Sequence, residues 1–154
     1  MTADRIVVTT GSSAGFLLSF LGCFDVGDTV ALCSSGYPCY RNILQATSLE
    51  CVTININSEF KIAAKEVLEE INRREQQQMK KISGLILSSP SNPTGVMLSP
   101  QELGDLCKLC DANDIVFISD EIYHGITYGT QKEDTALRYS DSAIVINSFS
   151  KVLT

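Results

Sequence analysis

Two short apolar runs, residues 84–88 and 115–119, contain no charged side chain. Runs of this kind are typical of strands that are covered on both faces, as in a parallel sheet between two layers of helices. The segment between them begins with S-P-Q-E at residues 99–102, a capping box with proline at the first helical position, and continues with apolar residues at helical spacing. A strand, a helix and a second strand in this order predict a right-handed crossover between parallel neighbours.

The rest of the chain repeats this alternation. Further strands are expected from β-branched or apolar runs, and further helices from apolar spacing and from a proline in a first turn. We expect residues 73–81 to be an exposed, solvated helix end. Six strands alternating with helices predict a three-layer α/β/α fold with a mainly parallel sheet. The expected strands are 6–9, 29–33, 50–56, 84–88, 115–119 and 143–148, and the other expected helices are 16–24, 38–46 and a segment from Ala63 onward.

Composition excludes several classes of protein. The chain has 154 residues, 44% of them hydrophobic, and a net charge of −6. Its basic residues are dispersed, so the chain lacks the basic stripe that nucleic-acid binding needs. It has no apolar stretch near the ~18 residues that would suggest a membrane span. We expect a cytoplasmic protein, and targeting to an organelle stays open because a leader could precede Met1.

Six cysteines are irregularly spaced, and only Cys107 and Cys110 form a recognisable pattern, C-x-x-C. A zinc site would need a second pair of ligands, and a redox pair would be expected at a helix N-terminus after a strand. Residues three apart share a face of a helix. We therefore expect these two cysteines to be small buried hydrophobic residues, and we expect no metal site.

Four polar clusters follow strand-like runs, at residues 11–15, 92–95, 120–123 and 148–151. In parallel sheets, ligands bind outside the carboxyl ends of the strands, where these clusters would meet. G-S-S-A-G at 11–15 opens a helix, whose free N–H groups suit an anion such as a phosphate, although a serine-rich N-cap is an equal explanation.

Asp120 follows a buried strand, where a carboxylate needs a cationic partner. A metal, an arginine and a protonated heterocyclic nitrogen would each meet that need. Asn92 and Tyr123 could reach a phenolic oxygen, and Tyr37 offers a flat face for stacking. His124 is expected to be structural.

The motifs G-S-S-A-G at 11–15, S-P-S-N-P-T-G at 89–95, S-D-E-I-Y at 119–123 and S-F-S-K at 148–151, together with Tyr37, resemble the successive motifs of class I/II aminotransferases. These are fold-type I enzymes that depend on pyridoxal phosphate. The order and spacing match across nearly the whole chain. The resemblance implies that residues 1–154 are part of the large, cofactor-binding domain of such an enzyme.

The resemblance implies a role for each motif. Lys151 would form the Schiff base with the cofactor and move the substrate proton, Asp120 would pair with the pyridinium nitrogen, and Tyr123 would complete the catalytic set. The other expected cofactor-binding residues are Asn92 at the 3′ oxygen, Tyr37 stacked on the ring, and Ser12, Ser13, the Ala14 amide, Ser148 and Ser150 around the phosphate.

The implied activity is transfer of an amino group from an amino acid to a 2-oxo acid, in a homodimer when the protein is full length. The family's G-x-R strand and its carboxylate-binding arginine would follow Lys151, so we expect the small domain and the C-terminal part of the large domain to be absent. Two alternatives stay open: a fold-type I lyase or synthase that uses the same cofactor, and a truncated, non-catalytic module.

Overall fold

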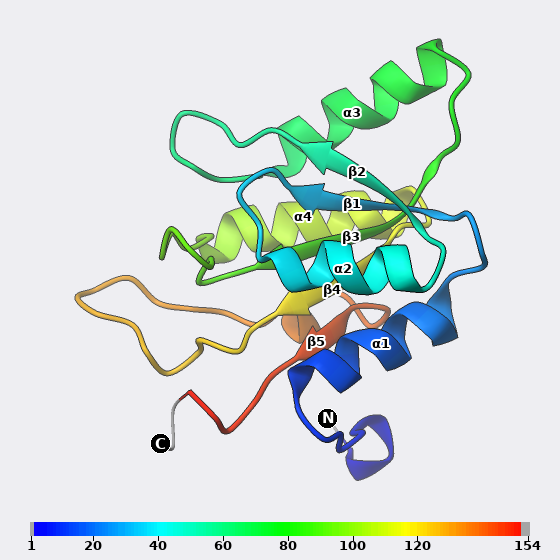
Figure 1. The fold of residues 1–154 in the computed structure, drawn as a ribbon. Helices are drawn as coiled ribbons and strands as arrows, with labels where there is room; N and C mark the ends of the chain where they lie inside the picture. Colours follow the sequence, from blue (N-terminus) through cyan, green and yellow to red (C-terminus); the bar gives the residue numbers. More distant parts are fainter. Residues whose placement is uncertain (1, 152–154) are drawn as a thin grey trace.

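Five parallel strands form a single sheet in the order β2-β1-β3-β4-β5 (Figure 1). The structure is a computed structural model, and it describes residues 2–151. The mainly parallel sheet predicted from the apolar runs is confirmed. The strands are β1 (Thr29–Cys33), β2 (Glu50–Ile54), β3 (Ile82–Ser88), β4 (Val116–Asp120) and β5 (Ile144–Ile146).

Three of the four α-helices connect successive strands, the first precedes the sheet, and each lies where the sequence predicted a helix. Pro38 occupies the first turn of its helix, where a missing N–H costs no hydrogen bond. The capping box at Ser99 is complete: Ser99 Oγ accepts from the Glu102 amide at 3.2 Å, and Glu102 Oε2 accepts from the Ser99 amide at 2.7 Å. The helices are α1 (Ser12–Cys23), α2 (Pro38–Ala46), α3 (Ala64–Gln76) and α4 (Pro100–Ala112), with 3-10 turns η1 (Ala3–Arg5) and η2 (Ala136–Arg138).

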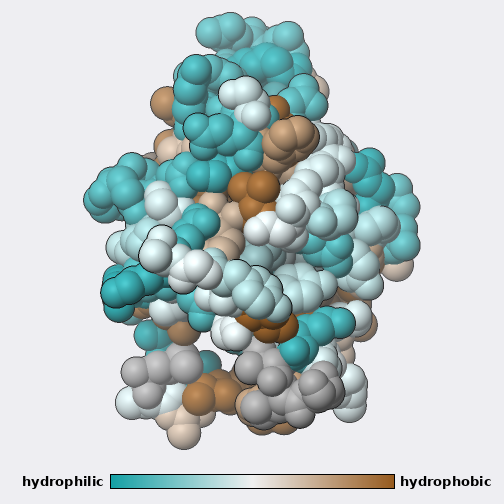
Figure 2. Space-filling model, turned by 90° about the vertical axis from the view of Figure 1, so that its left-hand side faces the viewer, coloured by the Kyte–Doolittle hydropathy of each residue, from teal (hydrophilic) through white to brown (hydrophobic). Residues whose placement is uncertain are grey.

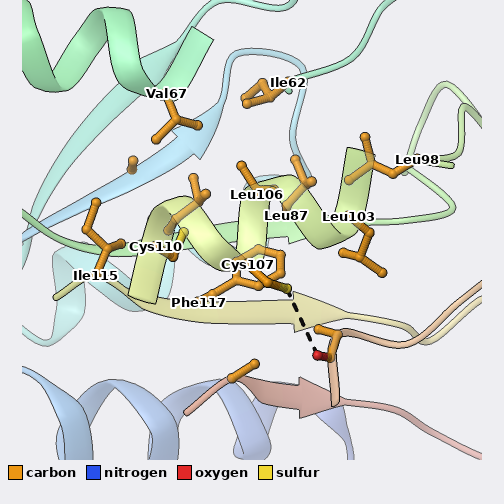
Figure 3. Packing of buried hydrophobic residues seen from close by; sticks show 14 of the residues in the cluster. Ile62, Val67, Leu87, Leu98, Leu103, Leu106, Cys107, Cys110, Ile115 and Phe117 are labelled. Atoms are coloured by element: carbon orange, nitrogen blue, oxygen red, sulfur yellow. Dashed lines mark hydrogen bonds between the residues drawn. The ribbon is translucent and has the colours of Figure 1, made fainter. Parts of the chain in front are cut away.

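The helices cover both faces of the sheet. Alternate strand residues point to opposite faces, so Ala31, Leu85 and Phe117 pack with α3 and α4 in one buried cluster (Figure 3). Their neighbours in sequence, such as Val30 and Ile86, pack with α1 and α2 in a second cluster. This arrangement is the three-layer α/β/α fold that the sequence predicted.

Cys107 and Cys110 are fully buried in the first cluster (Figure 3). Burial, followed by the nearby Asp111 carboxylate, raises the pKa of Cys107 to about 12, and burial raises the pKa of Cys110 to about 12. Both thiols are therefore protonated and unreactive at neutral pH. The expectation that they serve as small hydrophobic residues is confirmed.

The strand predicted at residues 6–9 is wrong. These residues are extended but pair with no strand of the described chain, and Val8 is 92% exposed. A β-branched run forms a strand only when a neighbour supplies ladder partners and covers one face. Neither condition is met at this position.

The prediction that residues 73–81 form an exposed helix end is also wrong in part. The helix ends at Gln76, and Arg74 is only 6% exposed. The Arg74 guanidinium donates from Nε to the Lys80 carbonyl oxygen at 2.7 Å and lies 3.6 Å from Glu70 Oε1. Burial of Arg74 is tolerated because its polar atoms meet both an acceptor and a carboxylate.

Gly84, in β3, sits directly beneath the ring of Phe24, which follows the last turn of α1. A Cβ at this position would overlap the ring, whereas a Cβ at Gly22 of α1 would meet nothing. The absent side chain at Gly84 therefore lets α1 lie close to the sheet.

We predict that Gly84→Ala lowers the free energy of unfolding by about 1–3 kcal/mol, because the Phe24 ring must shift. The matched control Gly22→Ala should leave it unchanged or raise it by up to about 1 kcal/mol, because alanine is the better helix former. Urea denaturation measures both variants. Equal effects of the two substitutions would contradict this description of the packing.

Candidate functional site

The carboxyl ends of all five parallel strands lie at one edge of the sheet, on the left of Figure 1. The loops that follow the strands gather there, and Figure 2 views the molecule from that side. Most of this face is hydrophilic or neutral, with hydrophobic atoms visible toward its middle. The four polar clusters that the sequence singled out all begin at this edge.

Asp120 is the last residue of β4 and is 5% exposed. Its Oδ1 accepts from the Ile122 amide at 3.2 Å, and its Oδ2 accepts from the Tyr40 hydroxyl. Burial raises the pKa of this carboxyl above its ordinary value, and the two hydrogen bonds act in the opposite direction. Among the described residues, Asp120 is thus a buried acid with two neutral donors and no ion-pair partner.

Tyr40 is a residue that the sequence analysis missed. It lies in the first turn of α2, is 3% exposed and packs its ring on Phe16 with centroids 4.9 Å apart. Its position four residues before the buried Leu44 marks it as core-facing, and a buried tyrosine hydroxyl requires a hydrogen-bond partner. That requirement was the available signal.

The neighbouring carboxylate, Glu121, has a hydrogen-bond or ion-pair partner at each of its two oxygens. Its Oε1 accepts from the Ser119 hydroxyl at 3.0 Å and from the Ala136 amide at 2.9 Å, and its Oε2 lies 3.4 Å from His124 Nδ1. His124 Nε2 lies 3.1 Å from the Ser89 carbonyl oxygen. His124 therefore links the loop after β4 to the loop after β3, in keeping with the structural role expected of it.

Asn92 and Tyr123 meet as the sequence predicted they could. Asn92 Nδ2 donates to the Tyr123 hydroxyl oxygen at 3.2 Å, which joins the loop after β3 to the loop after β4. Both side chains are half-buried. The pair presents an amide and a phenol, two groups that can donate to one oxygen of a ligand.

Ser12, Ser13 and Ala14 form the first turn of α1, so their amides are among those left unpaired at a helix N-terminus. Gly11 precedes them with a φ of 119°, a conformation that glycine adopts readily. A Cβ on Gly15 would lie 3.2 Å from Ile146 Cδ1, so α1 begins against the end of β5. Figure 1 shows this juxtaposition.

Ser148, Ser150 and Lys151 follow β5 directly. The Ser148 and Ser150 hydroxyls lie 2.8 Å apart, and the Ser150 amide donates to Ser148 Oγ at 3.0 Å. The Lys151 side chain is exposed. These contacts form a compact turn that starts beside the first turn of α1.

Tyr37 precedes α2 and is 44% exposed, with its ring set edge-on against Tyr40 at 5.7 Å between centroids. One part of the ring surface is thus open to a ligand. The structure brings Tyr37, Tyr40 and Asp120 into one connected group, and Asn92 with Tyr123 into another.

Within residues 2–151, no three histidine, cysteine, aspartate or glutamate side chains gather in a way that could hold a metal ion. The helices of this part of the chain are also too short or too polar to cross a membrane. Asp120 therefore has no metal-ligand cluster around it in the described structure.

Comparison with known proteins places the chain in a family. The sequence profile of Aminotransferase class I and II matches residues 1–154. A valine–pyruvate aminotransferase of Mycobacterium tuberculosis is 46% identical over 150 residues, which are 96% of this chain and 37% of that protein. A probable aspartate aminotransferase of Methanocaldococcus jannaschii is 30% identical over 148 residues, with the same two shares.

Solved structures agree with these relatives. An aminotransferase from Mycobacterium tuberculosis superposes with a TM-score of 0.88 at 45% identity, over 98% of this chain and 40% of that one. A pyridoxal-phosphate-bound C–S lyase from Staphylococcus hominis superposes with a TM-score of 0.84 at 25% identity, over 98% and 39% of the two chains.

The chain thus spans about 37% of the length of the curated relatives that it matches. The match extends over residues 1–154, and the fold agrees across nearly all of that length. The chain belongs to the class I and II aminotransferase family.

Proposed function

We propose that this chain binds pyridoxal phosphate and is the cofactor-binding part of an aminotransferase, which moves an amino group from an amino acid to a 2-oxo acid. The observation that carries the proposal is Asp120, a carboxylate buried at the end of β4, three residues before Tyr123 of the Asn92–Tyr123 pair. A protonated ring nitrogen is the partner that such a carboxylate needs.

The donor set of this edge fits the cofactor. The first turn of α1 offers unpaired amides and two serine hydroxyls to a phosphate. Asn92 and Tyr123 offer donors to a phenolic oxygen, and the exposed face of Tyr37 offers a stacking surface. These groups come from different loops at the edge where α/β sheets bind their ligands.

When bound, pyridoxal phosphate supplies an electron sink for the carbanion formed at the substrate Cα. Asp120 would hold the proton on the ring nitrogen, which keeps the ring electron-poor. Lys151 would supply the amine that attaches the cofactor, and afterwards that amine would move the proton between the substrate Cα and the cofactor. Tyr123, held by Asn92, would orient the ring.

The named relatives suggest which substrates to test first. The relative from Mycobacterium tuberculosis is named a valine–pyruvate aminotransferase, so valine as amino donor and pyruvate as acceptor are our first candidates. We propose that residues 1–154 belong to the large domain, and that the matching small domain lies in the further length that the relatives have. A homodimer of the complete enzyme is part of the same proposal.

We predict that pyridoxal phosphate, followed by borohydride reduction and peptide mapping, labels Lys151. The experiment uses protein expressed from the complete reading frame that contains these codons. The expected result is one dominant pyridoxyl-lysine, lost in Lys151→Ala, because Lys151 is the lysine that follows β5 in the S-F-S-K motif. Visible absorbance of the unreduced complex is a second measurement.

Lys65→Ala is the matched control, since Lys65 is 79% exposed in its side chain and lies on α3. It should leave the labelling unchanged. Labelling spread over surface lysines, and equal in the two variants, would refute the proposal. Labelling of Lys151 with release of a thiol or ammonia and no amino transfer would retain the cofactor and assign a lyase reaction.

A second prediction concerns the stability cost of Asp120. Because burial raises the pKa of Asp120 in the folded state, its protonated form favours folding, and this contribution is lost as pH rises through the folded-state pKa. Asp120→Asn should therefore raise the free energy of unfolding of the ligand-free protein at neutral pH. The gain should shrink toward pH 3.8, the ordinary aspartate value.

Urea denaturation at several pH values measures this effect. Asp25→Asn, at an exposed aspartate in the loop after α1, should show no gain. If Asp120→Asn is less stable than the wild type at neutral pH, Asp120 is a structural anchor and does not carry an unmet need for a cation.

A further inference from the structure

Tyr40 connects three parts of the candidate site. Its hydroxyl donates to Asp120 Oδ2, its ring packs on Phe16 of α1 at 4.9 Å, and its edge meets Tyr37 at 5.7 Å. Phe16 lies one turn beyond the unpaired amides of Ser12 and Ser13. One buried side chain thus contacts the acid, the stacking residue and the helix that offers an anion site.

The hydrogen bond from Tyr40 fixes how the Asp120 carboxylate is turned. An ionised carboxylate has about four lone-pair positions on its two oxygens. The Tyr40 hydroxyl uses one on Oδ2, and the Ile122 amide uses one on Oδ1. With one donor on each oxygen the group cannot rotate without losing both bonds, and it retains acceptor capacity for a further N–H.

Tyr40 can act only as a donor toward Asp120. Burial, followed by the charge of Asp120, raises the pKa of Tyr40 well above the ordinary tyrosine value, so the phenol keeps its proton. A hydrogen bond donated to a carboxylate favours the ionised form. The other ionisable groups that act on this pair are Glu121, which disfavours charge on Asp120, His124, which favours it, and Tyr123, which disfavours charge on Tyr40.

We propose that Tyr40 is a positioning residue for the cofactor, acting through Asp120: it holds the carboxylate ionised and turned so that one face stays open to a protonated ring nitrogen. The inference rests on the proposed binding of pyridoxal phosphate. Packing in the core does not by itself require the Tyr40 hydroxyl, because a phenylalanine would fill the same space.

The test uses Tyr40→Phe, which removes only the hydroxyl. In the ligand-free protein, the carboxyl carbon of Asp120 is followed by NMR through a pH titration. The apparent pKa of Asp120 should rise in Tyr40→Phe, because the ionised form loses its donor. This measurement needs no cofactor, so it stands even if the chain binds no pyridoxal phosphate.

The second measurement is the dissociation constant for pyridoxal phosphate, obtained by equilibrium dialysis at neutral pH. Tyr40→Phe should weaken binding about tenfold, as expected for a hydrogen bond to a charged group. The matched control is Tyr139→Phe, since the Tyr139 hydroxyl also donates to a carboxylate, Asp134, at 2.6 Å but lies outside the site. The control should leave both the Asp120 titration and the affinity unchanged.

The outcomes separate the two proposals. A raised Asp120 pKa with weaker binding supports the role of Tyr40. An unchanged Asp120 titration, or equal loss of affinity in Tyr40→Phe and Tyr139→Phe, would overturn it. Absence of pyridoxal-phosphate binding in the wild type would instead refute the proposed function. Circular dichroism confirms that both variants are folded before either measurement is interpreted.

Discussion

A carboxylate buried at the end of an interior strand, β4, is the constraint on which the rest of the site depends. Asp120 pairs in register with Ser88 of β3 on one side and with Ile146 of β5 on the other. The loops that leave these two strands carry Asn92 and Lys151. Because the three strands are parallel and hydrogen-bonded, the position of Asp120 fixes where both loops begin. The buried carboxylate and the loops after β3 and β5 therefore lie together at one edge of the sheet.

The two adjacent acids at this point differ in how completely the protein satisfies them. Glu121 has the Ser119 hydroxyl, the Ala136 amide and His124 around it, and it joins β4 to η2. Within residues 2–151, Asp120 has only neutral donors, although an unpaired buried charge costs several kcal/mol. Glu121 thus joins parts of the fold, whereas Asp120 can still accept a hydrogen bond from a cationic group of a ligand. The sheet tolerates this because helices cover it on both faces and supply the core.

Local sequence signals predicted most of the framework. Apolar or β-branched runs predicted all five strands, and the Ser99 capping box and Pro38 marked helix starts that the structure confirms. The strand expected at residues 6–9 failed because strand formation depends on a neighbour, which periodicity does not reveal. Arg74 was misjudged for a similar reason, since its acceptor, the Lys80 carbonyl oxygen, comes from a segment that folds back on α3.

Site residues that belong to sequence motifs could be predicted. Site residues that are defined only by tertiary contacts could not. Asn92 and Tyr123 were expected at a common edge, and they touch. Tyr40 was not singled out, because its partner Asp120 is 80 residues away in sequence. The roles of Lys151 and of the serines at the start of α1 stay predictions.

The most direct test of this account is a crystal structure of the protein from its complete reading frame with pyridoxal phosphate bound. The account predicts the ring nitrogen at hydrogen-bond distance, about 3 Å, from the Asp120 carboxylate, with Tyr40 still donating to Oδ2. A ring nitrogen that faces another group, with Asp120 turned away from the ligand, would contradict it.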